Sequence, residues 1–267
     1  MNPADTTPLI LTYNEEPNLR RSLERLQWAA EVVVLDSFSS DATEAIARSF
    51  ANVRYVQRKF DDHTTQWNHG VSLVTTRWVL ALDADYVAPT NFASELQELE
   101  PGETAAFHVR FRYLIAGKAL RATLYPPRAV LFRPHACRYV VDGHTQALVV
   151  TGNTAFLQSV FDHDDRKPLS RWFISQDNYA KLEAQKLTDA GRGLRLQDKL
   201  RRTMMLAPLA TFFYCLIGKQ LIFDGWRGWF YTWQRVLAEV MLALRLLEAR
   251  LGEGQEFVRS RVVDEEP

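Results

Sequence analysis

The chain has 267 residues, of which 47% are hydrophobic, which is enough for one large or two small domains with a sizeable core. Basic and acidic residues number 32 each, so no positive excess indicates nucleic acid as a partner. Cys137 and Cys215 lie far apart and outside any metal-ligand spacing, which favours a reducing compartment without a structural disulfide. The first residues are polar and lead directly into an apolar strand, so we expect no secretory signal.

The first ninety residues alternate between short apolar strands and amphipathic helices. Between the strands, apolar residues recur at helical spacing, as do Leu19, Leu23 and Leu26. This order is typical of an α/β fold with a parallel sheet, in which ligands bind at the carboxyl ends of the strands. We expect strands at residues 8–13, 32–36, 53–56 and 78–82.

Carboxylates follow three of these strands: Glu15 after the first, Asp36 at the end of the second, and Asp83 and Asp85 after the fourth. Residues i and i+2 of an extended chain point to the same side, so Asp83 and Asp85 should lie together. A divalent metal carrying a diphosphate would relieve their repulsion, although such a pair can also simply cap a turn. Glycine-rich phosphate loops are missing from the sequence, which disfavours dehydrogenases and ATPases.

Three motifs carry a family resemblance: Leu-Thr-Tyr-Asn-Glu-Glu (11–16), Val-Val-Leu-Asp-Ser-Phe-Ser-Ser-Asp (33–41) and Leu-Ala-Leu-Asp-Ala-Asp (80–85). In this order and spacing they resemble the family 2 glycosyltransferases of the GT-A fold, near the bacterial lipopolysaccharide-core glucosyltransferase-like branch. The resemblance is strong over residues 8 to 90 and looser beyond. It implies a Rossmann-like GT-A domain that binds a nucleotide-diphospho-sugar.

The resemblance also implies the roles of individual residues. Asp36 would reach the base or ribose, and Asp85 would hold Mg²⁺ or Mn²⁺ on the diphosphate. Phe38 departs from the family, which usually has glycine in this loop. Gln66 and Asn68 could equally form an exposed helix face. The residues expected to contact the donor are Tyr13, Asn14, Glu15, Asp36, Gln66, Asn68 and Asp83.

The second half begins with a different strand pattern. Residues 104–114 alternate between apolar and polar side chains, which predicts a strand with one buried face. We expect a hairpin with residues 119–124 and another strand at 128–132. The acceptor is expected to bind in this part of the domain.

An inverting transfer needs a base whose pKa lies near the working pH, and four residues are candidates: Asp142, His144, Asp164 and Asp165. In the resembling branch a His-Glu pair often occupies the region of His144, and Thr145 replaces the acid here. Asp142 is therefore the first choice, with His144 as its partner or the alternative. Asp142 with the following glycine could also be only a hairpin turn.

The polar segment around His163 has several interpretations. It could be a loop that orients phosphates or the last helix, and Arg166 and Lys167 could contact the leaving diphosphate. A metal site built from His144 and His163 is a further alternative.

The C-terminal region is expected to be helical. A basic stretch at 192–202 precedes sixteen uncharged residues at 203–218, which are too few to span a bilayer. A further helix is expected at 231–251. Basic residues beside an aromatic-rich apolar helix are typical of proteins on an anionic membrane surface. The alternative is a helical hairpin packed on the catalytic domain or on a second subunit, which would make a homodimer.

We therefore predict a GT-A catalytic domain (1–190), a basic and apolar helical region on a membrane surface (191–252) and a flexible tail (253–267). The predicted activity is inverting, metal-dependent hexosyl transfer from a nucleotide sugar, expected to be UDP-linked. The acceptor would be a glycan or a lipid-linked molecule, as in lipopolysaccharide or cell-surface polysaccharide synthesis. The enzyme would be cytoplasmic and peripheral on the inner face of the membrane. The alternatives are a nucleotidyltransferase and a non-catalytic GT-A-like scaffold.

Overall fold

The computed structural model describes the backbone of residues 1–142, 145–189 and 196–263. Within these ranges it describes all side chains except those of Asp142, Thr145, Gln197 and residues 252–263. The chain divides into two compact units, Met1–Pro168 and Leu169–Pro267, which are described separately below.

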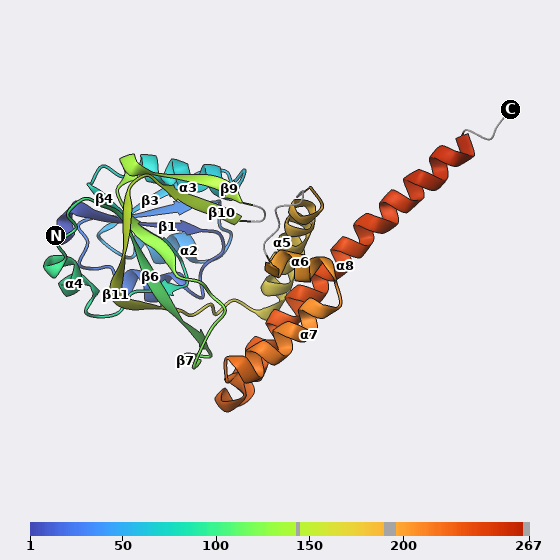
Figure 1. The fold of residues 1–267 in the computed structure, drawn as a ribbon. Helices are drawn as coiled ribbons and strands as arrows, with labels where there is room; N and C mark the ends of the chain where they lie inside the picture. The colour runs from blue at the N-terminus through green and yellow to red at the C-terminus, as the bar shows by residue number, and fades with distance from the viewer. Residues whose placement is uncertain (143–144, 190–195, 264–267) are drawn as a thin grey trace. The chain divides into compact units, whose positions relative to one another are not determined.

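The first unit contains a nine-stranded mixed sheet in the order β3-β2-β1-β4-β8-β6-β11-β5, with β7 paired to β6 (Figure 1). Its parallel half confirms the four expected strands: β1 (Thr6–Thr12), β2 (Val32–Asp36), β3 (Val53–Gln57) and β4 (Trp78–Asp83).

Both faces of this parallel half are covered by helices. Along β1, Ile10 packs into one core cluster and its neighbour Leu9 into the other, because successive side chains point to opposite faces. This burial on both faces explains why the sequences of these strands are nearly continuous runs of apolar residues. One face is covered by α1 (Leu19–Glu24), α2 (Thr43–Arg48) and α4 (Phe92–Glu98), and the other by α3 (His63–Ser72).

Antiparallel strands complete the sheet. β8 (Arg128–Phe132) lies between β4 and β6 (Thr104–Ile115), and β11 (Asn153–His163) runs parallel to β6. The short strand β5 (Tyr86–Val87) pairs with the end of β11, so that Tyr86 faces His163. The expected hairpin after β6 is shorter than predicted, since β7 comprises only Lys118–Ala119.

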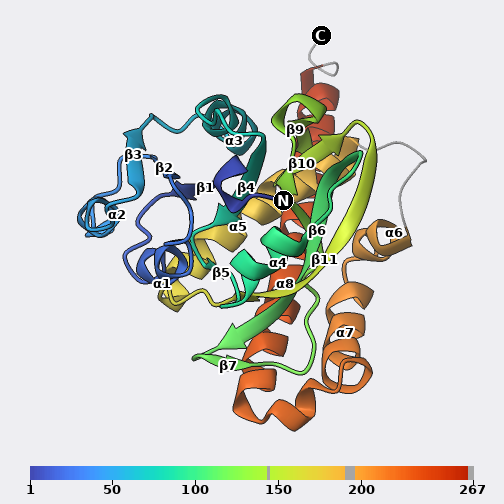
Figure 2. The same ribbon diagram turned by 90° about the vertical axis from the view of Figure 1, so that its left-hand side faces the viewer.

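A separate two-stranded sheet joins β9 (Cys137–Asp142) to β10 (Thr145–Val150) and lies against α3 (Figure 2). The amide of Asn68 on α3 bonds the backbone of Tyr139 on both sides: Nδ2 donates to its carbonyl (2.9 Å) and Oδ1 accepts from its N–H (3.0 Å). Asn68 therefore holds this two-stranded sheet against α3.

The second unit is helical. Its core cluster is formed by α5 (Leu169–Asp189), α8 (Trp226–Val263) and Met204, through residues such as Ala184, Leu187 and Leu246. The helix α7 (Leu206–Phe213) follows Met204 and also contacts α8. At the start of α8, a Cβ on Gly228 would lie 1.8 Å from the carbonyl oxygen of Leu221, so only glycine permits this close approach. The connecting elements are α6 (Leu196–Arg202), a π-helical turn (Tyr214–Gly218) and a 3₁₀ turn (Leu221–Asp224).

The domain boundary differs from the expected one. The compact units meet between Pro168 and Leu169, so α5 groups with the C-terminal helices, because its apolar face packs on α8. The expected boundary at residues 190 and 191 lies outside the described residues. The backbone of residues 253–263, expected to be a loose tail, continues α8. Among the described residues, no helix combines the length and apolar character needed to cross a membrane.

Candidate active site

The strand ends that bear carboxylates converge on one edge of the sheet. β1 lies between β2 and β4, with Thr12 paired to Asp36 and Leu11 paired to Asp83. The end of β11 reaches the same edge, because His163 pairs with Tyr86 just after Asp85. Four segments that are remote in sequence therefore bring their polar residues together. The motifs predicted three of these segments, and the end of β11 is an addition that they did not predict.

Asp85 and His163 form a hydrogen-bonded ion pair at this edge. His163 Nε2 lies 3.1 Å from Asp85 Oδ2, and each side chain is 13% exposed. Burial disfavours both charges, but the attraction between them outweighs it, so the pKa of Asp85 is lowered and that of His163 is raised. Among the described residues, neither Asp85 Oδ1 nor His163 Nδ1 has a hydrogen-bond partner, although both atoms are buried.

Three tyrosines surround the imidazole of His163. Tyr125 stacks on it with centroids 4.6 Å apart, and Tyr113 and Tyr86 meet it edge-on at 4.6 and 5.5 Å. The hydroxyls of Tyr86 and Tyr125 are hydrogen-bonded to each other. This aromatic enclosure limits the orientations of the ring and lowers the local dielectric, which strengthens the Asp85–His163 interaction.

Buried ion pairs hold the segment after β11 in place. The carboxylate of Asp164, whose side chain is only 5% exposed, pairs with both Arg21 and Arg166. Its backbone N–H donates to the carbonyl of Asp85 (3.0 Å), and its carbonyl accepts from Arg21 Nη2 (2.8 Å). Asp164 is therefore engaged by two guanidinium groups, which would hinder it from acting as a base.

Glu15 and Asn18 form a second set of contacts with this segment. Lys167 Nζ lies 2.6 Å from Glu15 Oε1, and the buried amide of Asn18 donates to Glu15 Oε2 and Asp165 Oδ1, both at 2.9 Å. Burial raises the pKa of Glu15 to about 7, and the charge of Glu15 helps to raise the pKa of Lys167 despite its own burial. Arg166 and Lys167, which we considered as contacts for a diphosphate, are already paired with carboxylates.

The loops after β1 and β2 are joined by hydrogen bonds. Asp36 is fully buried, and its carboxylate accepts from Thr12 Oγ1 (2.8 Å) and from the N–H and hydroxyl of Ser39 (2.8 and 2.5 Å). Asn14, at φ 54°, donates its N–H to Ser39 and accepts from Ser40 N, each at 2.8 Å. Asp36 and Asn14 thus shape the wall of the expected nucleoside site.

The remaining expected donor contacts differ in accessibility. Tyr13 is 53% exposed and Asp83 is partly exposed, so both can reach a ligand. Gln66 is buried and bonds Ser37 and Arg58, which braces the loop after β2. The amide of Asn68 is fully engaged by the hairpin, as described above. The alternative of an exposed helix face does not apply to Gln66, which is 1% exposed.

Of the two proposed bases, only the backbone of Asp142 lies within the described residues. Asp142 ends β9, and its backbone pairs with Thr145. The side chain of Asp142 and the whole of His144 lie outside the described residues. Their catalytic roles therefore stay predictions.

Phe38 adopts a left-handed backbone conformation, which glycine accommodates without strain. Its φ is 61°, a left-handed value that costs a residue with a Cβ about 1–2 kcal/mol. We expect Phe38→Gly to stabilise the first unit by about 1 kcal/mol, since part of the relief is offset by the greater chain entropy of glycine. Urea unfolding, monitored by amide exchange in β1 and β4, would measure the change in the free energy of unfolding. Ser40→Gly in the same loop should give no gain, and an equal gain there would contradict the explanation.

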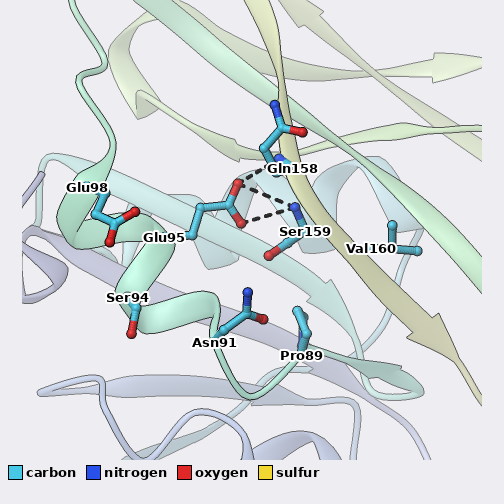
Figure 3. A pocket seen from close by; sticks show the side chains of 8 residues that line it. All are labelled: Pro89, Asn91, Ser94, Glu95, Glu98, Gln158, Ser159 and Val160. Atoms are coloured by element: carbon cyan, nitrogen blue, oxygen red, sulfur yellow. Dashed lines mark hydrogen bonds between the residues drawn. The ribbon is translucent and has the colours of Figure 1, made fainter.

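A shallow hollow of about 450 Å³ lies elsewhere, between α4 and β11 (Figure 3). The carboxylate of Glu95 points across it and accepts from the backbone N–H groups of Gln158 (2.6 Å) and Ser159 (3.1 Å). These N–H groups lie where the pairing of β11 with β6 shifts register. Glu95 thus satisfies the irregular part of β11, and none of the carboxylates expected to bind the donor or the metal lines this hollow.

A divalent metal fits the chemistry of the Asp85 region. Within the described residues no cluster of three or more His, Cys, Asp and Glu side chains could hold an ion. Mg²⁺, however, commonly uses one or two protein carboxylates together with substrate phosphates. The buried, unpaired Oδ1 of Asp85 offers such a ligand, while His163 holds the other carboxylate oxygen.

Sequence reasoning missed the partners that shape this site. Asn18, Arg21 and Arg128 received no role, and His163 was considered only within a loop that orients phosphates or the last helix, or in a metal site with His144. Asn18, Arg21 and His163 contact residues far along the chain, and no local periodicity signals such contacts. The available signal was the composition of the segment at 163–167, in which every residue is either charged or a histidine.

Comparisons with known proteins indicate the family of the chain. Residues 9–164 match the model described as glycosyl transferase family 2. Over 101 residues the chain is 29% identical to the lipopolysaccharide core biosynthesis glycosyltransferase LpsC of Rhizobium meliloti (strain 1021). That match covers 36% of this chain and 36% of the relative, so it spans about a third of the relative's length.

The chain is also similar to solved structures. The mannosyltransferase PcManGT from Pyrobaculum calidifontis, in complex with GDP-Man and Mn²⁺, has a TM-score of 0.51 at 15% identity, over 92% of this chain and 86% of that one. Glucosyl-3-phosphoglycerate synthase from Mycobacterium tuberculosis, in complex with Mn²⁺, UDP and phosphoglyceric acid, has a TM-score of 0.47 at 16% identity, over 71% and 81%. The likeness to PcManGT supports the GT-A fold that the motifs implied.

Proposed function

The chain belongs to glycosyl transferase family 2, and from that premise we propose that it transfers a hexose from a nucleotide-diphosphate sugar, expected to be UDP-linked. The acceptor is a glycan or a lipid-linked molecule. The observation that carries this proposal is the convergence of Asp36, Asp83, Asp85 and His163 on one edge of the sheet. The name of the R. meliloti relative supports a role in making a cell-envelope glycan such as the lipopolysaccharide core.

The donor would lie along this edge. Tyr13, with the loops shaped by Asn14 and Asp36, would contact the nucleoside, and Asp83 would face the ribose. Glu15, Gln66 and Asn68 would contribute by holding neighbouring segments, because their polar groups are bonded within the protein. Buried, hydrogen-bonded supports of this kind keep a binding site close to its productive geometry.

Asp85 would hold Mg²⁺ or Mn²⁺, and His163 would orient its carboxylate through the Nε2–Oδ2 contact. When bound, such an ion supplies positive charge that offsets the charge on the leaving diphosphate. The tyrosines around His163 exclude water from this side of the site and keep the imidazole in place.

Inversion follows from a single displacement. The acceptor hydroxyl oxygen forms a bond to the anomeric carbon while the bond from that carbon to the diphosphate oxygen breaks on the opposite face. The electron pair of the broken bond leaves with the nucleoside diphosphate. The hydroxyl proton passes to a base, for which Asp142, with His144 as its partner, is our proposal.

A panel of nucleotide sugars tests this function. Purified protein with Mn²⁺ should release the nucleoside diphosphate from one UDP-hexose faster than from the others, and more so when a glycan or lipid-linked acceptor is present. Incorporation of nucleotide instead of sugar would favour the nucleotidyltransferase alternative. The absence of both binding and turnover over UDP- and GDP-sugars would contradict the proposal.

We further propose that the second unit docks on the inner face of an anionic membrane. Its helices expose large apolar side chains, including Phe223 (67%) and Trp226 (59%). Cations lie on the exposed rings: Arg227 over Trp226 at 4.5 Å and Lys219 over Tyr214 at 5.4 Å. Exposed aromatic rings beside lysine and arginine suit the interface between lipid headgroups and acyl chains. Others in this set are Met205, Leu206, Leu209, Phe213, Ile217, Ile222 and Trp233.

Flotation with vesicles tests this docking. The protein should rise with vesicles that contain phosphatidylglycerol and rise less with phosphatidylcholine alone, because the cations favour an anionic surface. The double variant Phe223→Ser/Trp226→Ser should remain at the bottom of the gradient. The matched control Leu244→Ser/Leu251→Ser removes two equally exposed side chains from α8 and should still float. A doubled mass in solution without flotation would indicate a homodimer and would contradict membrane docking.

A further inference from the structure

Arg128 is an arginine at the carboxylate-bearing edge with no assigned role. It begins β8, which runs antiparallel beside β4 with Leu131 opposite Leu80. Burial lowers the pKa of its guanidinium, but nearby groups, including the charge of Asp83, raise it. A cation thus stands beside the carboxylates at which the substrates are proposed to bind.

An aromatic stack positions the guanidinium of Arg128. Its Cζ lies 5.1 Å from the ring centroid of Tyr125, and the same ring stacks on His163, which contacts Asp85. A planar guanidinium resting on an aromatic face keeps its N–H groups directed outward in the plane, as phosphate recognition requires. Arg128 is thereby linked to Asp85 through two ring contacts.

The hydrogen-bonding capacity of Arg128 is not used up within the protein. Its Nε is buried and has no hydrogen-bond partner in the described part of the chain. The other cations of the site already form ion pairs: Arg21 and Arg166 with Asp164, and Lys167 with Glu15. Leaving a buried donor unsatisfied costs about 1–3 kcal/mol, so an incoming anion would be favoured at Arg128.

Arg133, which directly follows β8, is an arginine whose contacts lie within the protein and serves as a comparison. It also rests on an aromatic ring, that of Trp78, at 4.7 Å. Its Nε and Nη2 donate to the carbonyls of Thr104 (3.0 Å) and Gly102 (2.6 Å). The packing of the two arginines is similar, and the difference is the unused donor of Arg128.

We propose that the guanidinium of Arg128 binds a phosphate group of a substrate. The phosphate belongs either to the diphosphate of the donor or to a phosphorylated acceptor, and the chemistry of recognition is the same. This inference rests on the proposed function. It adds to the site a fixed positive charge that the motifs of the parallel half do not supply.

Calorimetric titrations in Mn²⁺ test the proposal with Arg128→Met, Arg128→Lys and the matched control Arg133→Met. If the donor supplies the phosphate, Arg128→Met should bind UDP at least tenfold more weakly than the parent while binding uridine equally well. If the acceptor supplies it, UDP binding should stay unchanged and binding of inorganic phosphate to the UDP-loaded protein should be lost. Arg128→Lys should recover part of either loss, and Arg133→Met should show neither.

Three negative results are distinguishable. If Arg128→Met binds UDP and inorganic phosphate as the parent does, the proposal for Arg128 is overturned and the proposed function stands. If the parent protein binds neither UDP nor GDP, the proposed function fails and the role of Arg128 fails with it. A uniform loss of uridine and UDP binding would indicate a structural role and would also overturn the proposal.

Discussion

Asp85→Asn should lower turnover about a thousandfold while the protein remains folded. Asparagine keeps the size of the side chain and can still accept a hydrogen bond from His163, but it removes the charge from the buried, unpaired oxygen. A thousandfold loss corresponds to about 4 kcal/mol of transition-state stabilisation, as expected when the charge on a leaving diphosphate is no longer offset. Steady-state rates with the preferred nucleotide sugar, measured across Mn²⁺ concentrations for the parent and the variant, would measure this loss of turnover.

The control for this substitution is Asp162→Asn. Asp162 lies next to His163 in β11, but it forms an outward pair with Arg112, whose side chain is 54% exposed. We expect nearly unchanged turnover, because exposed ion pairs contribute little. If Asp85→Asn retained metal-dependent turnover within about fivefold of the parent, Asp85 would not be the metal ligand.

Asp164→Ala should cost the first unit about 3 kcal/mol of stability. The carboxylate is buried and neutralises Arg21 and Arg166 together, and removing one partner of a buried pair leaves charge without compensation. The segment that carries His163 should then loosen, because Asp164 also links it to α1 through Arg21. Urea unfolding reported by amide exchange in β1 and β4 would show the lower stability.

Asp162→Ala is the matched comparison, two residues away on the same segment. It removes a carboxylate of the same size from a more exposed pair and should cost less than about 1 kcal/mol. Equal losses in the two variants would mean that the burial of Asp164 does not matter. In that case the contacts of Glu15, Asn18 and Lys167 would be what holds the segment after β11 in place.

The loop after β2 shows how local chemistry and tertiary contacts combine. The sequence indicated a polar loop and an unusual Phe38, and the structure keeps the left-handed backbone at that position despite the side chain. Ser39 holds the loop by donating two hydrogen bonds to Asp36, and Asn14 binds it from the neighbouring strand end through one bond each with Ser39 and Ser40. The strain at Phe38 persists because these contacts outweigh it.

Asn68 illustrates the opposite case. Its place on a helix with polar neighbours allowed both donor contact and an exposed face. Its actual partner, the backbone of Tyr139, lies 71 residues away in a hairpin whose position the sequence did not indicate. A side-chain amide pairs equally well with a backbone or with a ligand, so its chemistry alone could not choose between them.

The sequence by itself determined the parallel half of the sheet, the edge at which its polar residues gather and the family to which the chain belongs. Those features depend on local periodicity and on strand ends that meet by the geometry of βαβ units. Only the tertiary structure decided that β8 lies beside β4, that His163 reaches Asp85, and that Arg166 and Lys167 are neutralised while Arg128 keeps an unpaired donor. These contacts join residues far apart in the chain, and which charges meet depends on strand register and burial, which no short pattern encodes.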